Sequence, residues 1–126
     1  MLVKRFEDLH CWQAAREMTR FIYELADKPR FRRDRRLVEQ ITGASLSAMN
    51  NIAEGFDSKS RIESRRFYGY ARRSCSEVQS CLYVALDRNY IDDKEFTTAY
   101  EMAQKTRRMT SAWSRAATEK RESVHD

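Results

Sequence analysis

The stretch at residues 34–55, "DRRLVEQITGASLSAMNNIAEG", decides how the rest of the chain can fold. Its apolar side chains recur at steps of three and four, the spacing of one face of an α-helix. They are Leu37, Ile41, Ala44, Ala48 and Ile52. Asp34 is a residue type that caps helix N-termini, and Gly55 is typical of a left-handed C-terminal cap. We therefore expect one helix of about six turns that begins after Asp34 and ends at Gly55.

The same spacing predicts three further helices, over residues 8–27, 60–89 and 92–114. Pro29 cannot continue the 8–27 helix, and Ser60 with Glu63 fits a capping box at the start of the 60–89 helix. Asn89 is suited to end that helix. Four helices joined by short turns pack most economically as an antiparallel up-down-up-down four-helix bundle, so the expected fold class is all-α. We place the bundle at residues 1–114 and expect the polar residues 115–126 to form a disordered tail.

The composition agrees with one mostly helical domain. The 126 residues include three glycines and one proline, where average usage gives about three times as many glycines and about six prolines. The three cysteines form no CxxC pair, and no signal peptide is recognisable, so we expect reduced thiols in a cytoplasmic protein. No apolar run approaches the ~18 residues of a membrane span, so we expect no membrane partner.

The residues that common enzyme and metal sites need are not arranged for such chemistry. Di-metal bundles use a Glu-x-x-His pair on each of two helices, and neither His10 nor His125 follows a glutamate at that spacing. The cysteines do not match a zinc pattern, and we interpret them as core residues; they are Cys11, Cys75 and Cys81. The glycines are isolated, so there is no glycine-rich phosphate loop. We expect a non-enzymatic protein with no catalytic residue, no metal and no cofactor.

Polar side chains follow the flank of the apolar face in the 34–55 helix, where they could be half-buried. At 100° per residue this stripe holds Gln40, Ser47, Asn51 and Glu54. In the 60–89 helix, Ser74 lies within the apolar stripe and Glu77 at its edge. Glu54 and Glu77 could form a carboxylate pair for acid–base chemistry. We favour the alternative, a structural polar network that fixes helix register, made of Gln40, Asn51, Glu54, Ser74 and Glu77.

Positive charge is concentrated in two stretches, 28–36 ("KPRFRRDRR") and 59–73 ("KSRIESRRFYGYARR"), each with six basic residues and one acidic residue. They begin at opposite ends of a bundle, because the helix between them is about 31 Å long. Arginine forks suit phosphate oxygens, and an exposed Phe31 could stack on a base. Alternatively, Phe31 covers the end of the core and the arginines are solvated or pair with acids of a neighbouring chain. The candidate nucleic-acid-binding residues are Arg30, Arg32, Arg33, Arg35, Arg36, Lys59, Arg65, Arg66, Arg72 and Arg73.

Several sequence blocks together resemble a known family. "FEDLHCW" at 6–12, "NIAEG" at 51–55 and "ARRSCSEV" at 71–78, with Gln40-Ile41 and Tyr90-Ile91, are similar to the 23S rRNA intervening-sequence proteins, small bacterial four-helix bundles. The resemblance implies a ring-like homo-oligomer, a homopentamer. The chain also resembles the accessory protein of diversity-generating retroelements, a basic pentameric barrel that works with nucleic acid and a reverse transcriptase.

Taken together, the basic stretches and the resemblance predict an oligomer that binds structured RNA or DNA. A ring would repeat each basic cluster and add avidity. The alternative is an assembly scaffold whose partner is another protein, without nucleic-acid binding.

Overall fold

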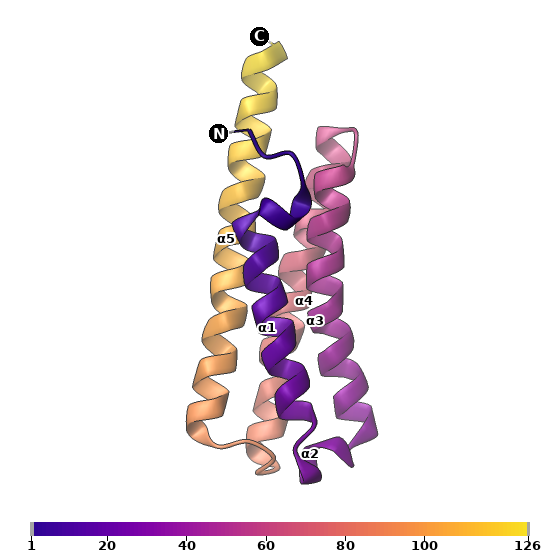
Figure 1. Cartoon of the computed structure of the whole chain (residues 1–126), viewed down its shortest axis with the longest axis vertical. Helices are drawn as coiled ribbons and strands as arrows, with labels where there is room; N and C mark the ends of the chain where they lie inside the picture. Colours follow the sequence, from indigo (N-terminus) through magenta and orange to yellow (C-terminus); the bar gives the residue numbers. More distant parts are fainter. Residues whose placement is uncertain (1, 126) are drawn as a thin grey trace.

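The computed structural model describes residues 2–125, with side chains as far as residue 117. Four long helices lie side by side along the long axis of the molecule (Figure 1): α1 (His10–Ala26), α3 (Arg35–Asp57), α4 (Arg61–Asp87) and α5 (Asp93–His125). A 3-10 turn, η1 (Phe6–Asp8), precedes α1, and the short helix α2 (Pro29–Arg32) joins α1 to α3. The described residues include no strand, so the all-helical prediction is confirmed.

The connections between the helices lie at the two ends of the molecule (Figure 1). We call the end that holds both chain termini the upper end; the connection from α3 to α4 also lies there. At the lower end lie α2 and the connection from α4 to α5. The basic stretch 28–36 is therefore at the lower end, whereas the stretch 59–73 begins at the upper end, as expected.

Side-chain caps start α3 and α4 at the expected positions, and a third starts α5, where Asp92 Oδ1 accepts a hydrogen bond from the Glu95 amide at 2.7 Å. Asp34 Oδ1 accepts a hydrogen bond from the Leu37 amide at 3.1 Å at the start of α3. Ser60 Oγ accepts one from the Glu63 amide at 3.1 Å at the start of α4. Each of the three caps satisfies an amide that has no partner within its own helix.

The end of α4 depends on a left-handed residue. Asn89 has a φ of 60°, a conformation that asparagine tolerates better than most residues. The Asn89 amide donates to the Leu86 carbonyl and the Tyr90 amide donates to the Ala85 carbonyl, both at 2.9 Å. These two bonds form a Schellman motif, and the prediction that Asn89 ends this helix is confirmed.

Gly55 does not end α3, and that prediction is wrong. The helix continues to Asp57, and none of the described glycines has a positive φ. Gly55 is buried, and a Cβ built on it would lie only 2.5 Å from Tyr68 Cε1 of α4. Glycine is therefore required here because the Tyr68 ring packs directly on the α3 backbone.

α5 is longer than predicted. Residues 115–117, which we placed in a polar tail, continue the helix, and α5 ends at His125. Ala116 and Ala117 are strong helix formers, so no local signal ends the helix at residue 114. The side chains of residues 118–126 are outside the described part of the chain, so disorder of that stretch stays a prediction.

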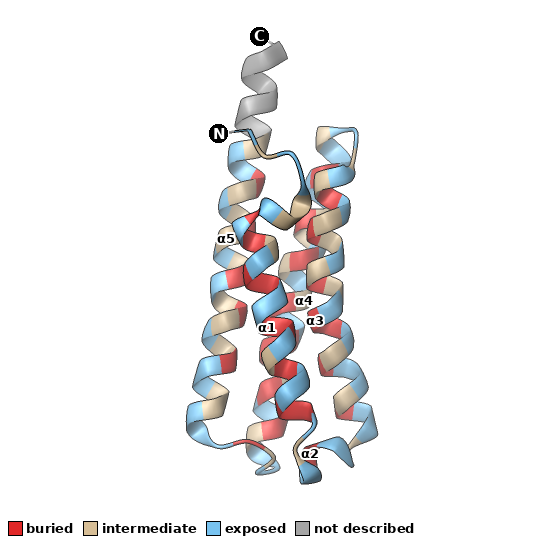
Figure 2. Cartoon of the chain, viewed as in Figure 1, coloured by how far each residue is buried: buried red, intermediate tan, exposed pale blue. Residues whose placement is uncertain are grey.

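The core runs along the inward faces of the long helices (Figure 2). The larger apolar cluster draws fully buried side chains from all four, including Met18, Ile22, Ile41, Leu82 and Ala99. A smaller cluster at the upper end is built around Leu9, Cys11, Ala15, Ile52 and Ala71. Packing of these faces, rather than helix propensity, supplies most of the stability of such helices.

Candidate nucleic-acid interface

Five exposed arginines surround α2 at the lower end of the molecule. We call them the lower basic surface: Arg30, Arg32, Arg33, Arg35 and Arg36. Within the part of the chain whose side chains are described, none of the five forms an ion pair with a carboxylate. Lys28 differs, because its Nζ lies 2.6 Å from Glu95 Oε1 at the start of α5. The arginines of this surface are therefore not neutralised by the described acids of the same chain.

The backbone under these arginines is held by packing and hydrogen bonds. Phe31 is completely buried and packs against Tyr90, with ring centroids 5.4 Å apart. The Tyr90 hydroxyl donates to Asp34 Oδ2 at 3.0 Å, while the other carboxylate oxygen of Asp34 caps α3. The Arg30 guanidinium lies 6.0 Å from the centroid of the Tyr90 ring. The turn is thus anchored on its inner side and presents cations on its outer side.

The burial of Phe31 corrects one expectation. An exposed ring could have stacked on a base, but Phe31 closes the lower end of the core and has no exposed surface. Burying a large apolar ring stabilises the fold more than leaving it in water. Any base stacking in this protein must therefore use another aromatic side chain.

The second group of predicted cations lies in the connection before α4 and along the upper half of that helix. Lys59, Arg65, Arg66 and Arg73 are exposed, and Arg72 is half-buried. Within residues 64–76 there are four arginines and no acid. This part of α4 is therefore positively charged on its solvent side.

α5 adds basic residues that sequence reasoning missed. Residues 102–117 contain no acid and four cations, Lys105, Arg107, Arg108 and Arg115. This part of α5 lies beside the basic part of α4, since Trp113 Nε1 donates to the Tyr68 hydroxyl at 2.9 Å. The four cations are spread through a helix and do not form a run. The signal that could have found them is the absence of acids over 102–117.

Part of the predicted polar network exists between α3 and α4. The Asn51 side-chain amide donates to the Ser47 carbonyl at 2.8 Å and to Ser47 Oγ at 2.9 Å. Ser74 Oγ donates to Ser47 Oγ at 2.9 Å across the two helices. Asn51 and Ser74 are therefore brought together through Ser47, which the predicted network did not include.

The other three predicted members, Gln40, Glu54 and Glu77, are exposed and lie outside this cluster. The placement of these three in a half-buried network was wrong. Their flexible side chains reach water from the flank of the helices, so they need no partner inside the bundle.

Glu54 and Glu77 also do not form a carboxylate pair. Ser47 meets Ser74, and Gly55 meets Tyr68, so α3 and α4 run in opposite directions. Glu77 is three residues beyond Ser74 and therefore lies at the level of about residue 44 of α3. It is separated from Glu54 by about 15 Å along the helix, at 1.5 Å per residue. This separation rules out a shared acid–base site.

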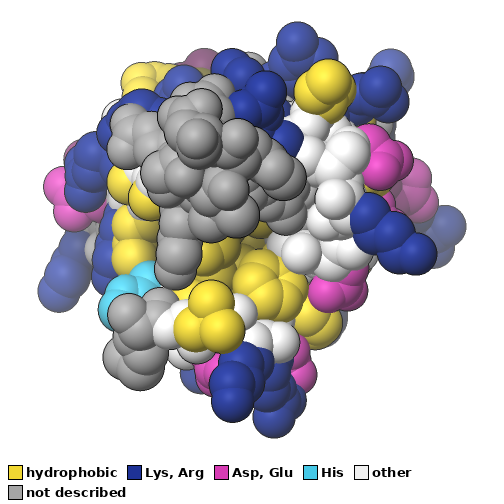
Figure 3. Space-filling model, turned by 90° about the horizontal axis from the view of Figure 1, so that it is seen from above, with side chains coloured by type: hydrophobic (Ala, Val, Ile, Leu, Met, Phe, Trp, Pro, Cys, Tyr) yellow, Lys and Arg dark blue, Asp and Glu magenta, His cyan; other side chains and the backbone are white. Residues whose placement is uncertain are grey.

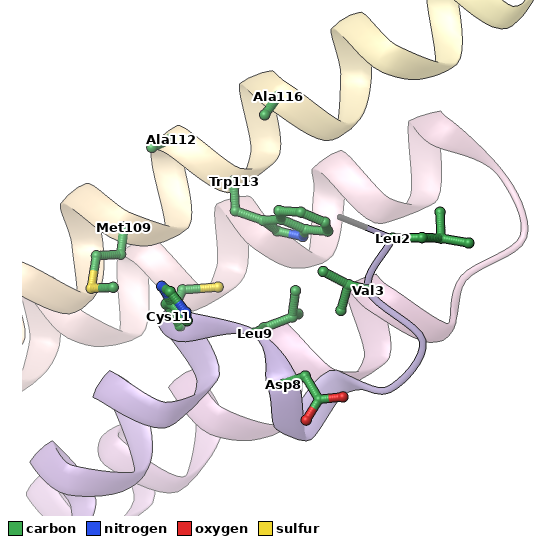
Figure 4. A pocket seen from close by; sticks show the side chains of 10 residues that line it. Leu2, Val3, Asp8, Leu9, Cys11, Met109, Ala112, Trp113 and Ala116 are labelled. Atoms are coloured by element: carbon green, nitrogen blue, oxygen red, sulfur yellow. The ribbon is translucent and has the colours of Figure 1, made fainter.

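An apolar pocket of about 700 Å³ opens at the upper end between the N-terminal segment, the start of α1 and α5. Trp113 projects from α5 toward the N-terminal segment and Cys11 lies near Met109 (Figure 4). Seen end-on, apolar side chains are exposed at this end, with basic side chains at several places around the rim (Figure 3). The pocket is apolar in character and does not contain the predicted basic residues.

Burial raises the pKa of all three cysteine thiols and so disfavours the reactive thiolate form. Burial raises the pKa of the Cys11 thiol to about 11 and that of Cys75 to about 12, so both remain protonated at neutral pH. A protonated thiol is a poor nucleophile and a poor metal ligand. Within the described residues, no three side chains of the metal-binding types form a group.

Two comparisons bear on the identity of the chain. The sequence model of a family described as "23S rRNA-intervening sequence protein" matches residues 7–112. No curated protein matches the chain significantly. Among the described residues, no helix contains an apolar stretch long enough to cross a membrane.

Proposed function

The chain belongs to the 23S rRNA-intervening sequence protein family, and we propose that it is a non-enzymatic bundle protein that binds structured RNA or DNA through its arginines. The proposal includes the up-down-up-down path of the chain and its assembly into a ring-like homo-oligomer, a homopentamer. The connections at alternating ends of the molecule support the path. In a ring, each basic surface would be repeated around the particle, which increases avidity.

The observation that carries this proposal is the lower basic surface. Its five arginines are exposed and free of ion pairs with described carboxylates, and they project from a turn anchored by Phe31 and Asp34. Guanidinium groups bind phosphate oxygens through paired N–H donors. A surface of this kind can bind any nucleic acid, because binding releases counterions from the phosphate backbone.

The test is binding of labelled rRNA fragments and duplex DNA, measured by fluorescence anisotropy at low salt. We expect wild-type protein to bind and the triple variant Arg30→Glu, Arg32→Glu, Arg33→Glu to bind at least about tenfold more weakly. A matched control reverses three other exposed cations outside the two basic stretches, Lys4, Arg20 and Lys94. The control changes the net charge equally, so a larger loss in the first variant locates the contact.

Two outcomes would contradict the proposal. One is the absence of binding by the wild-type protein at low salt. The other is an equal loss in both triple variants, which would show that net charge alone matters. If the Arg30, Arg32 and Arg33 variant instead changes the oligomeric mass in light scattering, those arginines serve contacts between subunits, as the scaffold alternative predicts.

A further inference from the structure

Arg107 lies in the seam between α4 and α5 with an incompletely satisfied guanidinium. Its Nε is buried and has no hydrogen-bond partner, and its Nη1 donates only to the neutral side chain of Gln79, at 3.3 Å. Within the described side chains it has no carboxylate partner. A buried donor without an acceptor is costly and rare in folded proteins. A half-buried guanidinium with an unsatisfied donor and no carboxylate partner indicates a binding site for an anion.

A second arginine near this seam, Arg72 of α4, has its Nη2 only 3.7 Å from the position of a Cβ built on Gly69, one turn toward the upper end and away from Gln79. Gln79 donates to Gln104 at 3.0 Å, and Trp113 donates to Tyr68 at 2.9 Å, so residue numbers fall along α4 as they rise along α5. This register places Arg72 at the level of residues 107–111 of α5. Arg72 is seven residues before Gln79, two helical turns along the same face, and it is half-buried.

Cations outnumber acids around this position, where Glu77 and Glu101 are the nearest acids along the two helices. Residues 64–76 of α4 and 102–117 of α5 contain eight basic residues and no acid. The guanidinium fork matches a phosphate better than a point charge does. Phosphate is therefore the anionic group that the seam fits.

An aromatic cluster lies further down the same seam. The ring of Tyr83 lies 4.9 Å from that of Phe96 and 6.1 Å from that of Tyr100, measured between centroids. Tyr83 is 51% exposed, so a planar ligand can reach it. Gln79 connects the two regions, because its amide also contacts the Tyr100 carbonyl at 3.5 Å. An exposed aromatic side chain can stack on a base, provided that the base is not already stacked inside a duplex.

We propose that the α4–α5 seam binds a single-stranded nucleic-acid segment, with a phosphate on Arg107 and an unstacked base on Tyr83. This inference rests on the proposed function and specifies that the seam binds single-stranded nucleic acid. A loop of a structured RNA presents such a segment. The lower basic surface then contributes sequence-independent attraction from the lower end of the molecule, the end toward which Tyr83 lies.

Arg107 has a matched control in its neighbour Arg108, which is exposed. Either residue changed to glutamine removes one positive charge at almost the same position. We expect Arg107→Gln to weaken binding of a short unstructured oligonucleotide about tenfold, and Arg108→Gln to weaken it about twofold or less. Arg107→Lys retains the charge but removes the fork, and it should lose most of the same affinity. Melting curves of all three variants check that the fold is intact.

The stacking contact is tested with Tyr83→Leu against Tyr23→Leu, a change at a tyrosine of α1 that is 42% exposed. We expect only Tyr83→Leu to weaken oligonucleotide binding, by about fivefold or more, with little change for a blunt duplex. Equal effects of the two tyrosine variants would overturn the stacking contact, and equal effects of the two glutamine variants would overturn the phosphate site. Both results would leave the proposed function standing, whereas no binding by wild-type protein to any nucleic acid would refute the proposed function itself.

Discussion

Gly55 sets the distance between α3 and α4, because the Tyr68 ring occupies the space that a Cβ would need. Tyr68 in turn accepts the hydrogen bond from Trp113 of α5. The absence of a Cβ at Gly55 therefore influences the packing of three helices at the upper end.

Substitution of Gly55 by alanine tests this role. We expect Gly55→Ala to lower the free energy of unfolding by about 1–3 kcal/mol, since overpacking forces Tyr68 to move. Gly43→Ala is the matched control, because Gly43 is in the same helix and a Cβ added to it would meet no atom within 4 Å. It should raise stability by about 0.5–1 kcal/mol through helix propensity alone. Urea denaturation measures both, and a stabilising Gly55→Ala would contradict the close packing.

At this scale, sequence reasoning works where the cause is local. Asp34 and Ser60 were predicted as caps, and Asn89 as a helix end, because each effect depends on a few neighbouring residues. The role of Gly55 was predicted wrongly and the burial of Phe31 was left open. In both cases the residues that pack against them come from α4 or from the connection after it. A glycine at a close contact and a glycine at a helix end look alike in the sequence.

The pairing of α3 with α4 depends on polar contacts as well as apolar ones. Ser47 accepts hydrogen bonds from Asn51 of its own helix and from Ser74 of the neighbouring helix. A sliding of one helix along the other would break the second bond and leave polar groups half-buried, which is unfavourable. We therefore interpret this small cluster as a device that fixes register, the role first expected of a larger network.

Ser74→Ala removes the side-chain bond of this cluster that crosses between the helices. We expect it to lower the free energy of unfolding by about 0.5–1.5 kcal/mol. Ser76→Ala serves as the control, since Ser76 is exposed and donates to the Arg72 carbonyl one turn earlier in its own helix, at 3.3 Å. The control should change stability by less than about 0.5 kcal/mol. Equal effects of the two substitutions would show that the contact between helices does not matter.

The helices themselves were largely predictable, because apolar spacing and caps are properties of each segment. What could not be predicted is which polar flanks meet. Glu54 and Asn51 lie on the same flank of α3, but only Asn51 is close enough to the core to need a partner. The basic residues of α5 gain significance only once that helix is placed beside α4.

For the whole molecule, charge is distributed on two separate surfaces. The lower basic surface lies at one end, and the basic parts of α4 and α5 lie side by side toward the other. A single nucleic-acid strand that touches both must run along the length of the bundle. The apolar pocket at the upper end differs from these basic surfaces, since most of the side chains that line it are apolar.

Salt dependence of nucleic-acid binding tests the role of these arginines most directly. Each phosphate contact contributes about 0.7–0.9 to the slope of log affinity against log salt concentration. We predict steep weakening of wild-type binding with salt, and a slope that is shallower by about 2–3 in the variant with Arg30, Arg32 and Arg33 reversed. An unchanged slope in that variant, or no wild-type binding at about 50 mM salt, would contradict the proposal that these exposed arginines bind phosphates.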